Sequence, residues 1–282
     1  MGFDNGLRDL VLPQSVETPV PAENGARARQ LTQLFQPNLK ALQEQSPMDF
    51  NIGFTAGNQY NLNDDGSKKI GYLASLTYRN STEFYEGIVN GQVFRKQDQD
   101  RSVLELIDDR TQSGNLGVNN VLISGLAGVS FKGLKSKYKL NVLHIQNGES
   151  SAAYIRQDNF NVNSNVIFND ALTYTQRSIT NVLLNGEHAN EDGSWKVSWK
   201  LSPTLSKIYD KDFRTTPFRF NDETGNFSIS PSESGEPSRI WRNLEEINIA
   251  GKLDLTRKHK LFGRDAKFKF GGAHTLKQRE FI

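Results

Sequence analysis

Apolar and polar side chains alternate residue by residue along several stretches of the chain. In the clearest, residues 195–202, Trp, Val, Trp and Leu alternate with Lys and Ser. Successive side chains of a β-strand point to opposite faces of a sheet, so a period of two predicts a strand with one apolar and one polar face. Eight such strands are predicted, over residues 49–61, 69–80, 120–132, 137–146, 172–189, 194–209, 243–256 and 265–281.

The connections between these strands alternate in length. Asn, Asp and Gly, which favour tight turns, cluster in two of the short ones. Short turns at one edge of a sheet and long loops at the other are typical of outer-membrane β-barrels. The short connections cover residues 63–68, 133–136, 190–193 and 257–264, and the long polar loops are predicted over residues 81–119, 147–170 and 210–242.

The chain contains few apolar residues from which to build a buried interior. Of its 282 residues 36% are hydrophobic, and the mean hydropathy is −0.59, so a thick core is not expected. Lipid would supply the missing core if strands of roughly 9 to 11 residues crossed a bilayer with their apolar side chains outward. Interfacial aromatic girdles are expected there, and they would contain Tyr60, Tyr72, Tyr138, Trp195 and Phe268 near the short turns, with Tyr78 and Tyr174 near the long loops.

Other architectures share the alternation. A soluble antiparallel sandwich or lipocalin-like barrel also alternates, but its apolar face needs a partner sheet. A closed eight-stranded barrel would have to accommodate many charged side chains in a filled interior, where each needs a partner. These interpretations leave two alternative functions open, a small passive outer-membrane barrel or adhesin, and a soluble all-β binding protein.

Composition and motifs exclude several function classes. The chain has no cysteine, and its 34 basic and 32 acidic residues are mixed, so no nucleic-acid partner is expected. No nucleophile elbow or phosphate-binding loop occurs, and we predict neither an enzyme nor a cofactor. No metal site is predicted either, because the histidines, at positions 144, 188, 259 and 274, are far apart in sequence.

The first 46 residues lack the alternation and are interrupted by prolines. Helical spacing of Ala28, Leu31, Leu34 and Phe35 leaves a short helix open within residues 26–45. Neither a secretion signal nor a transmembrane helix is predicted, because no basic and apolar leader occurs and no window approaches about 18 apolar residues.

Four segments share their pattern with a known family. They are GFDNGLR at residues 2–8, followed by Leu12-Pro13, FNIGFTAGN at 50–58, GYLASLTY at 71–78 and KFGGAHTLKQREF at 269–281. These segments resemble the barrel of TonB-dependent outer-membrane receptors of the Bacteroidetes type. The resemblance implies a barrel of about 22 strands, an N-terminal plug inside it and a TonB box.

This chain is expected to be a fragment of that barrel. No plug, TonB box or signal peptide is predicted in it, and about eight strands are expected. The fold class expected is therefore all-β, a partial antiparallel up-and-down transmembrane β-barrel in the cell outer membrane. If the long loops are extracellular, the first strand descends to the periplasm, so residues 1–46 form an extracellular loop segment and residues 47–282 the partial barrel.

The resemblance also implies partners and a function. The partners would be the receptor's own plug domain, its remaining barrel strands, the TonB complex, the lipid bilayer and a surface lipoprotein. The complete receptor would bind a nutrient of the siderophore, glycan or peptide class with its extracellular loops and import it with TonB-transmitted energy.

Candidate ligand contacts are the aromatic and arginine residues of the long loops, because rings and guanidinium groups stack on sugars, aromatic chelates and peptides. The same residues also serve to pack loops together. Inward-pointing basic residues are expected to face the lumen and its plug; these are Arg79, Arg177, Lys196, Lys200 and Lys252. The ligand-binding candidates are Phe213, Arg214, Phe218, Arg219, Phe220 and Trp241 in residues 210–242, with Tyr154 and Arg156 in residues 147–170.

Overall fold

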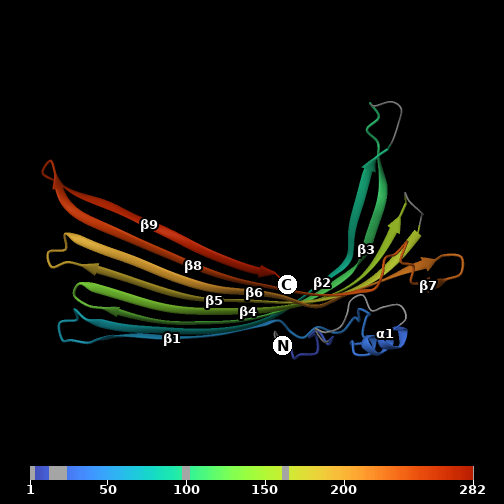
Figure 1. Ribbon diagram of the computed structural model, residues 1–282, viewed down its shortest axis with the longest axis horizontal. Coiled ribbons are helices and arrows are strands. Elements are labelled where there is room, and N and C mark those ends of the chain that lie inside the picture. Colours follow the sequence, from blue (N-terminus) through green and yellow to red (C-terminus); the bar gives the residue numbers. More distant parts are fainter. Residues whose placement is uncertain (1–3, 13–23, 97–101, 161–164, 282) are drawn as a thin grey trace.

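A single curved antiparallel sheet dominates the computed structural model, which describes residues 4–12, 24–96, 102–160 and 165–281 (Figure 1). Strands make up 72% and helix 3%, so the predicted all-β class is confirmed. The elements are α1 (Gly25–Thr32), β1 (Phe50–Asn61), β2 (Lys69–Arg95), β3 (Leu106–Lys132), β4 (Ser136–Asn159), β5 (Asn165–Ala189), β6 (Trp195–Asn221), β7 (Asn226–Ser228), β8 (Ser238–Leu261) and β9 (Arg264–Phe281).

The strands pair in up-and-down order, as predicted. Their order is β1-β2-β3-β4-β5-β6-β8-β9, and the short β7 pairs with the end of β6. Among the described residues, β1 pairs only with β2 and β9 only with β8, so the sheet has two open edges.

The strands are much longer than predicted. β2, β3 and β6 each contain 27 residues, which span roughly 90 Å at about 3.3 Å per residue. The prediction of long loops over residues 81–119, 147–170 and 210–242 is therefore wrong, because most of these residues continue the strands. In these segments both faces carry polar residues, so the alternation that marks a half-buried strand is weak although its backbone pairs regularly.

The register separates the sheet into two faces. The apolar face is mostly exposed in the described chain, with 66% of Phe54 and 56% of Leu253 accessible. We call the opposite side the polar face, which carries residues such as Arg79, Lys139, Asn185, Lys200 and Lys252. The apolar face carries Phe54, Leu76, Val129, Leu140, Leu184, Leu201, Leu253 and Phe270.

Aromatic side chains line up across the apolar face near the short turns. Tyr60, Phe131, Tyr138 and Trp199 occupy one register row on β1, β3, β4 and β6. The Trp199 ring lies over Gly186 on β5, where an added Cβ would come within 2.4 Å of the indole. Nearby, Tyr60 stacks on Tyr72 at 6.3 Å, and the Arg257 guanidinium lies 5.1 Å from the ring centroid of Trp195.

The apolar face has an edge on the side away from the short turns, which we call its outer edge. This edge lies closer to the short turns on each later strand, from β1 to β9. Phe50 on β1 and Val121 on β3 share one register row, which carries Gln176 on β5 and Asn243 on β8. Between that row and the short turns, the outermost apolar residues are Val182 on β5, Ile247 on β8 and Leu276 on β9. The apolar band therefore crosses the strands obliquely.

Two of the short turns have the same sequence pattern and the same hydrogen bonds. The segments NDDGS (63–67) and NEDGS (190–194) each place a glycine at positive φ, 65° at Gly66 and 67° at Gly193. The backbone N–H of Lys68 donates to Oδ1 of Asn63 at 2.8 Å, and that of Trp195 donates to Oδ1 of Asn190 at 2.8 Å. Both hairpins are thus closed by local side-chain bonds.

The register row of Asn80 divides the sheet into two parts. We call residues 81–96, 102–120, 149–160, 165–175 and 210–242 the long-hairpin half, and residues 50–80, 121–148, 176–209 and 243–281 the short-turn half. The β2–β3 hairpin bends away from its neighbours in Figure 1. A register shift between Tyr85 and Ile88 accompanies this bend, with Gly87 at a φ of 63°, as an extra bulge residue requires.

The N-terminal segment, residues 4–12 and 24–49, lies against the long-hairpin half (Figure 1). Its helix α1 is short and falls within the expected region, except that it begins at Gly25. Leu31 is its buried residue. The segment packs mainly through polar contacts, which define the candidate site below.

Candidate functional site

The candidate ligand contacts lie on strands and not in loops. Tyr154 and Arg156 are on β4, the five candidates from Phe213 to Phe220 are on β6, and Trp241 is on β8. β6 contains a bulge at Lys211 and Asp212, where the register to β8 shifts. The bulge exchanges the faces of the β6 residues beyond it, and alternation along the strand divides the candidates between the two sides. Phe213 and Arg219 lie on the polar face, and Arg214, Phe218, Phe220, Trp241, Tyr154 and Arg156 on the other.

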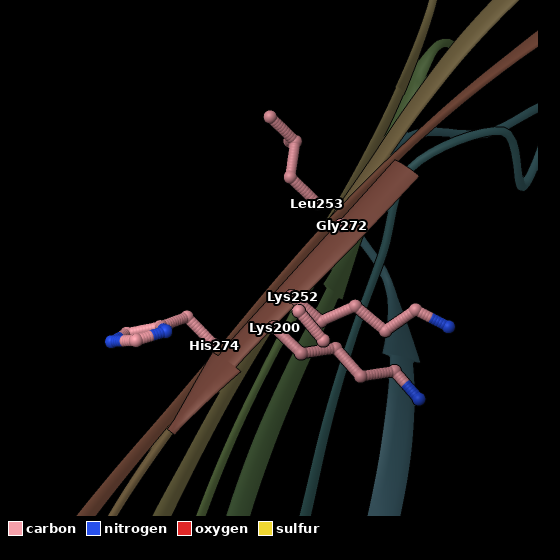
Figure 2. A pocket seen from close by; sticks show the side chains of 7 residues that line it. Lys200, Lys252, Leu253, Gly272 and His274 are labelled. Carbon is pink, nitrogen blue, oxygen red and sulfur yellow. The ribbon is translucent and has the colours of Figure 1, made fainter. Parts of the chain in front are cut away.

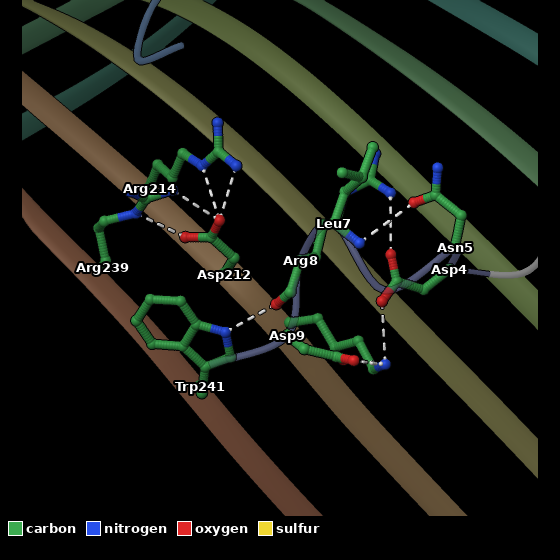
Figure 3. A network of polar contacts seen from close by, with 10 residues as sticks. Asp4, Asn5, Leu7, Arg8, Asp9, Asp212, Arg214, Arg239 and Trp241 are labelled. Atoms are coloured by element: carbon green, nitrogen blue, oxygen red, sulfur yellow. Dashed lines mark hydrogen bonds and ion pairs between the residues drawn. The ribbon is translucent and has the colours of Figure 1, made fainter. Parts of the chain in front are cut away.

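Asp212 is the centre of a buried ion cluster (Figure 3). Its carboxylate accepts from Nε and Nη2 of Arg214 at 3.0 and 2.6 Å, and from Nε and Nη2 of Arg239 at 2.7 Å each. The Asp212 side chain is 3% exposed and its backbone φ is 55°. Burial alone would raise the pKa of this carboxyl, but the hydrogen bonds from Arg239 and Arg214 outweigh burial and hold the pKa below its ordinary value.

The cluster holds the N-terminal segment. Arg214 donates to the carbonyl of Asn38, and Nη1 of Arg239 donates to the carbonyl of Gln36 at 3.0 Å. The indole N–H of Trp241 donates to the carbonyl of Arg8 at 2.8 Å. Phe35 stacks on Trp241 with a centroid distance of 5.8 Å, and the Arg239 guanidinium lies 4.9 Å from the Phe35 ring centroid. Arg214 and Trp241 are thus engaged within the chain itself.

A second set of ion pairs fixes residues 4–12. Nζ of Lys211 contacts Asp4 at 3.0 Å and Asp9 at 2.8 Å, and Arg8 lies over the Tyr174 ring at 4.5 Å. Burial would lower the pKa of Lys211, but the hydrogen bonds to Asp9 and Asp4 raise it above its ordinary value. The lysine therefore remains charged beside both carboxylates.

A separate aromatic cluster lies toward the tips of the long hairpins. We define it as Tyr154, Phe168, Phe220 and Phe227. Phe168 lies at its centre, with ring distances of 5.6, 5.8 and 5.5 Å to the other three. Tyr154 remains 41% exposed and Phe227 55% exposed, so the cluster offers ring surface to solvent. Arg156 lies 5.9 Å from the Phe168 centroid and is paired with Asp158 at 2.8 Å.

The remaining ligand candidates lie outside this cluster. Phe213 is covered by the Arg242 guanidinium at 5.3 Å, and Arg219 pairs with Glu233 at 2.8 Å. Phe218 faces Phe168 in the β5–β6 register. The structure therefore brings Tyr154, Arg156 and Phe220 together, with Phe218 beside Phe168 in the register. Phe213, Arg214, Arg219 and Trp241 contact other partners.

The residues predicted to face the lumen share the polar face. Arg79 and Arg177 lie in one register row, and Arg177 pairs with Glu149 at 3.3 Å. Lys196 pairs with Glu187 at 2.7 Å, while Lys200 faces Lys252 directly across β6 and β8. Figure 2 shows Lys200 and Lys252 extending to one side of the sheet, with Leu253 and His274 on the other, around a shallow hollow at Gly272.

The described residues contain no group of three or more His, Cys, Asp or Glu residues arranged to hold a metal ion. They also contain no helix that is long and apolar enough to cross a membrane.

Several site residues were not predicted from the sequence. Asp212 was missed because its two arginine partners come from different strands, one of them beyond a turn, and no local motif joins them. Phe168 and Phe227 were missed because their ring partners also come from other strands and no local motif joins them. A usable signal existed in the sequence, since Asp212 lies two residues before Arg214 and a buried arginine requires a partner for its charge.

Neither a family model nor a curated protein matches this chain.

Proposed function

We propose that this chain is part of a TonB-dependent outer-membrane receptor, with its short-turn half in the bilayer and its long-hairpin half outside. The observation that carries the proposal is the exposed apolar face, which extends over all the long strands. Soluble proteins rarely expose apolar patches larger than a few hundred Å². Lipid that covers this face removes its apolar side chains from water. The polar face then lines the lumen of the barrel.

The shape of the apolar band supports this orientation. Strands of a barrel tilt by about 35–45° from its axis. The boundary of a bilayer perpendicular to that axis therefore crosses each successive strand at a different register position. The oblique outer edge, from Phe50 on β1 to Leu276 on β9, has the form that such a tilt produces. The aromatic row of Tyr60, Tyr138 and Trp199 would lie at the periplasmic interface.

Nutrient capture would take place on the long-hairpin half. The aromatic cluster supplies exposed rings beside Arg156, and its proposed ligands remain of the siderophore, glycan or peptide class. Import driven by TonB would further require the plug and the rest of the barrel. Energy coupling is proposed from the resemblance of the quoted segments alone.

The chain's tryptophans provide a test of the orientation. Variants that keep one tryptophan and replace the others by Phe are reconstituted into vesicles whose lipids carry bromine on the acyl chains. Trp195 and Trp199 should be quenched, whereas Trp241, packed on Phe35 in the long-hairpin half, should not. Absence of quenching at both Trp195 and Trp199, with a monomer in plain buffer, would favour a soluble all-β protein. Steady ion conductance of the inserted chain would instead favour a passive barrel.

Ligand capture is tested by screening iron chelates, oligosaccharides and short peptides against the chain. For a ligand that binds, replacing both Tyr154 and Phe227 by Ala should weaken binding about tenfold. Phe262→Ala is the matched control, because Phe262 is 96% exposed at the opposite end of the sheet. Equal loss in both variants would place the ligand elsewhere.

A further inference from the structure

The β8–β9 hairpin extends past the ends of its neighbours β5 and β6. Trp195, the first residue of β6, pairs with Arg257 on β8, which pairs with Phe268 on β9. Beyond this row β8 and β9 continue to pair with each other as far as Leu261 and Arg264. The hairpin therefore protrudes about 13 Å beyond β6, at about 3.3 Å per residue.

This extra length matches the slope of the apolar band. On β1 the apolar face extends from Phe50 to Tyr60, which is about 33 Å along the strand and about 25 Å across a bilayer when the strand tilts by about 40°. The same number of residues counted from Leu276, the outermost apolar residue on β9, reaches Ala266, which pairs with His259. A bilayer that covers the apolar face would therefore have its boundary within the protruding hairpin.

The hairpin carries a high density of positive charge. Between residues 257 and 267 it contains five basic side chains and a single acidic one, Asp265. Within the described part of the chain, the side chains of the five basic residues form no hydrogen bond or ion pair, so their charges are available to an external partner. The basic residues are Arg257, Lys258, Lys260, Arg264 and Lys267.

Two of these cations lie on the side that would meet lipid. Arg257 and Arg264 belong to the apolar face, with His259 between them, and the hairpin carries no acidic side chain on this face among the described residues. The Arg257 guanidinium lies 5.1 Å from the ring centroid of Trp195, and Phe268 is the next residue across the sheet. Aromatic rings beside long cationic side chains are typical of protein segments at the headgroup layer, where the cations reach lipid phosphates.

The tip of the hairpin is apolar and strained. Phe262 and Gly263 form a two-residue loop with φ angles of 51° and 75°, and a bulky side chain rarely adopts the first of these. Phe262 is 96% exposed, so packing within the described chain does not account for the ring. The tip would lie about 8 Å beyond the bilayer boundary at His259, a depth that falls within the headgroup layer. Aromatic rings are favoured in that layer.

The two other turns of known repeat, NDDGS and NEDGS, have the opposite charge. They carry Asp64 and Asp65, and Glu191 and Asp192. Lys135 in the turn between β3 and β4 is already paired with Glu191 at 2.7 Å. A basic turn is therefore not a general property of this end of the sheet, and the β8–β9 hairpin requires an explanation of its own.

We propose that the β8–β9 hairpin binds anionic phospholipid headgroups, with Arg257 and Arg264 contacting their phosphates and Phe262 inserted beside them. The inference rests on the proposed function for the presence of a bilayer, and deepens it by assigning one class of lipid to one hairpin. The cations are exposed, so the preference for anionic lipid decreases as salt screens them.

The experiment uses the full chain with Trp195 as its single tryptophan, reconstituted into nanodiscs of equal parts phosphatidylcholine and phosphatidylglycerol. Bromine is placed on the acyl chains of one lipid or of the other, and the ratio of the two quenching efficiencies gives their relative affinity at Trp195. We expect phosphatidylglycerol to be favoured about threefold at low salt. Replacing Arg257, Lys260 and Arg264 by Gln should remove this preference, and the ratio cancels any effect of Arg257→Gln on the emission of Trp195.

A control variant replaces Lys132, Lys137 and Lys139 by Gln. It removes the same charge at the same end of the sheet but from the polar face, and should retain the preference. Equal quenching by the two lipids in the parent chain, or equal loss of preference in the control, would overturn the inference while leaving the bilayer orientation in place. Quenching by neither lipid would overturn both the inference and the proposed function.

Added anions test the nature of the occupant. Inorganic phosphate or poly-L-glutamate, present at equal charge concentration and compared with sodium chloride of the same ionic strength, should leave the preference unchanged. Complete loss with phosphate would assign a site for small anions, and complete loss with poly-L-glutamate a site for acidic polypeptides. Either result would overturn the assignment to lipid.

Discussion

The two halves of the sheet use the same strands in different ways. In the short-turn half, one face is apolar and exposed and the other carries opposed lysines. In the long-hairpin half both faces are largely polar, and arginines pair with carboxylates, as in Arg156 with Asp158 and Arg242 with Asp210. The short-turn half therefore leaves its apolar face uncovered, although it also contains ion pairs such as Lys196 with Glu187, whereas the N-terminal segment packs on the long-hairpin half.

This difference shows that backbone pairing and side-chain polarity are separate properties of a strand, although an alternating sequence displays both together. Backbone pairing continues without interruption from β3 to β4 across both halves. Side-chain polarity changes beyond Val121 on β3 and Val142 on β4, where the apolar face ends on these strands. Strand formation thus depends on the ladder, and the side chains decide which surroundings each part of the strand requires.

The largest effect is expected in the long-hairpin half at Asp212. Asp212→Ala leaves Arg214 and Arg239 buried without their carboxylate, which should lower the free energy of unfolding by about 3–5 kcal/mol. Urea unfolding and limited proteolysis of the N-terminal segment measure the effect. Asp222→Ala removes an exposed turn carboxylate as a control, and an equal loss there would contradict a special role for the cluster.

The short-turn half is tested by two adjacent leucines. Leu184 is on the apolar face and Leu183 on the polar face. Leu184→Arg should destabilise the vesicle-inserted chain by about 2–4 kcal/mol, because it places a charge in lipid. Leu183→Arg should change stability much less. Denaturant titration in vesicles compares the two, and indistinguishable titrations would remove the distinction between the faces.

A smaller effect is expected from filling the space under Trp199. Gly186→Ala would place Cβ against the indole, so the ring must move, at about 1–3 kcal/mol. Gly251→Ala is the matched control on the same face, with no neighbour within 4 Å of the added Cβ. Thermal unfolding and Trp199 fluorescence report the change; a stable Gly186→Ala variant with unchanged fluorescence would argue against this packing.

The smallest effect is a pH dependence of the N-terminal contacts. Asp212 has its pKa below the ordinary 3.8, so its contribution is present above that value and is lost as the pH falls through and below it. Lys211 has its pKa above the ordinary 10.5, so its contribution is lost as the pH rises beyond that value. Trp241 fluorescence, in a variant with no other tryptophan, should therefore stay constant between these limits. A transition near neutral pH would contradict this assignment.

Much of the fold could be predicted where one face of a strand is apolar. The segment from Trp195 to Leu201 alternates because apolar side chains share one face, and β6 begins at Trp195, one residue after the predicted start. Strand length could not be predicted on β3, where Gln112, Ser113 and Asn115 pair regularly with β4 although they form no apolar face. Polarity on both sides of a strand removes the period-two signal while leaving the hydrogen bonds intact.

The candidate site was less predictable than the fold. Aromatic and arginine composition indicated residues 210–242, and the aromatic cluster does contain Phe220. Composition could not show that Arg214 would share Asp212 with Arg239, because that depends on the bulge at Lys211 and on the register between β6 and β8. A single extra residue exchanges the faces of all side chains beyond it.

The repeated NDDGS and NEDGS turns bear on how the sheet assembles. Each closes its hairpin with bonds from its own residues, such as those of Asn63 and Asn190. Every long strand also pairs with its nearest long neighbours along the chain. Closing each hairpin brings together residues that are close in sequence, which keeps the loss of chain entropy small. The sheet can therefore grow one hairpin at a time from either end, each new strand using the preceding one as its template.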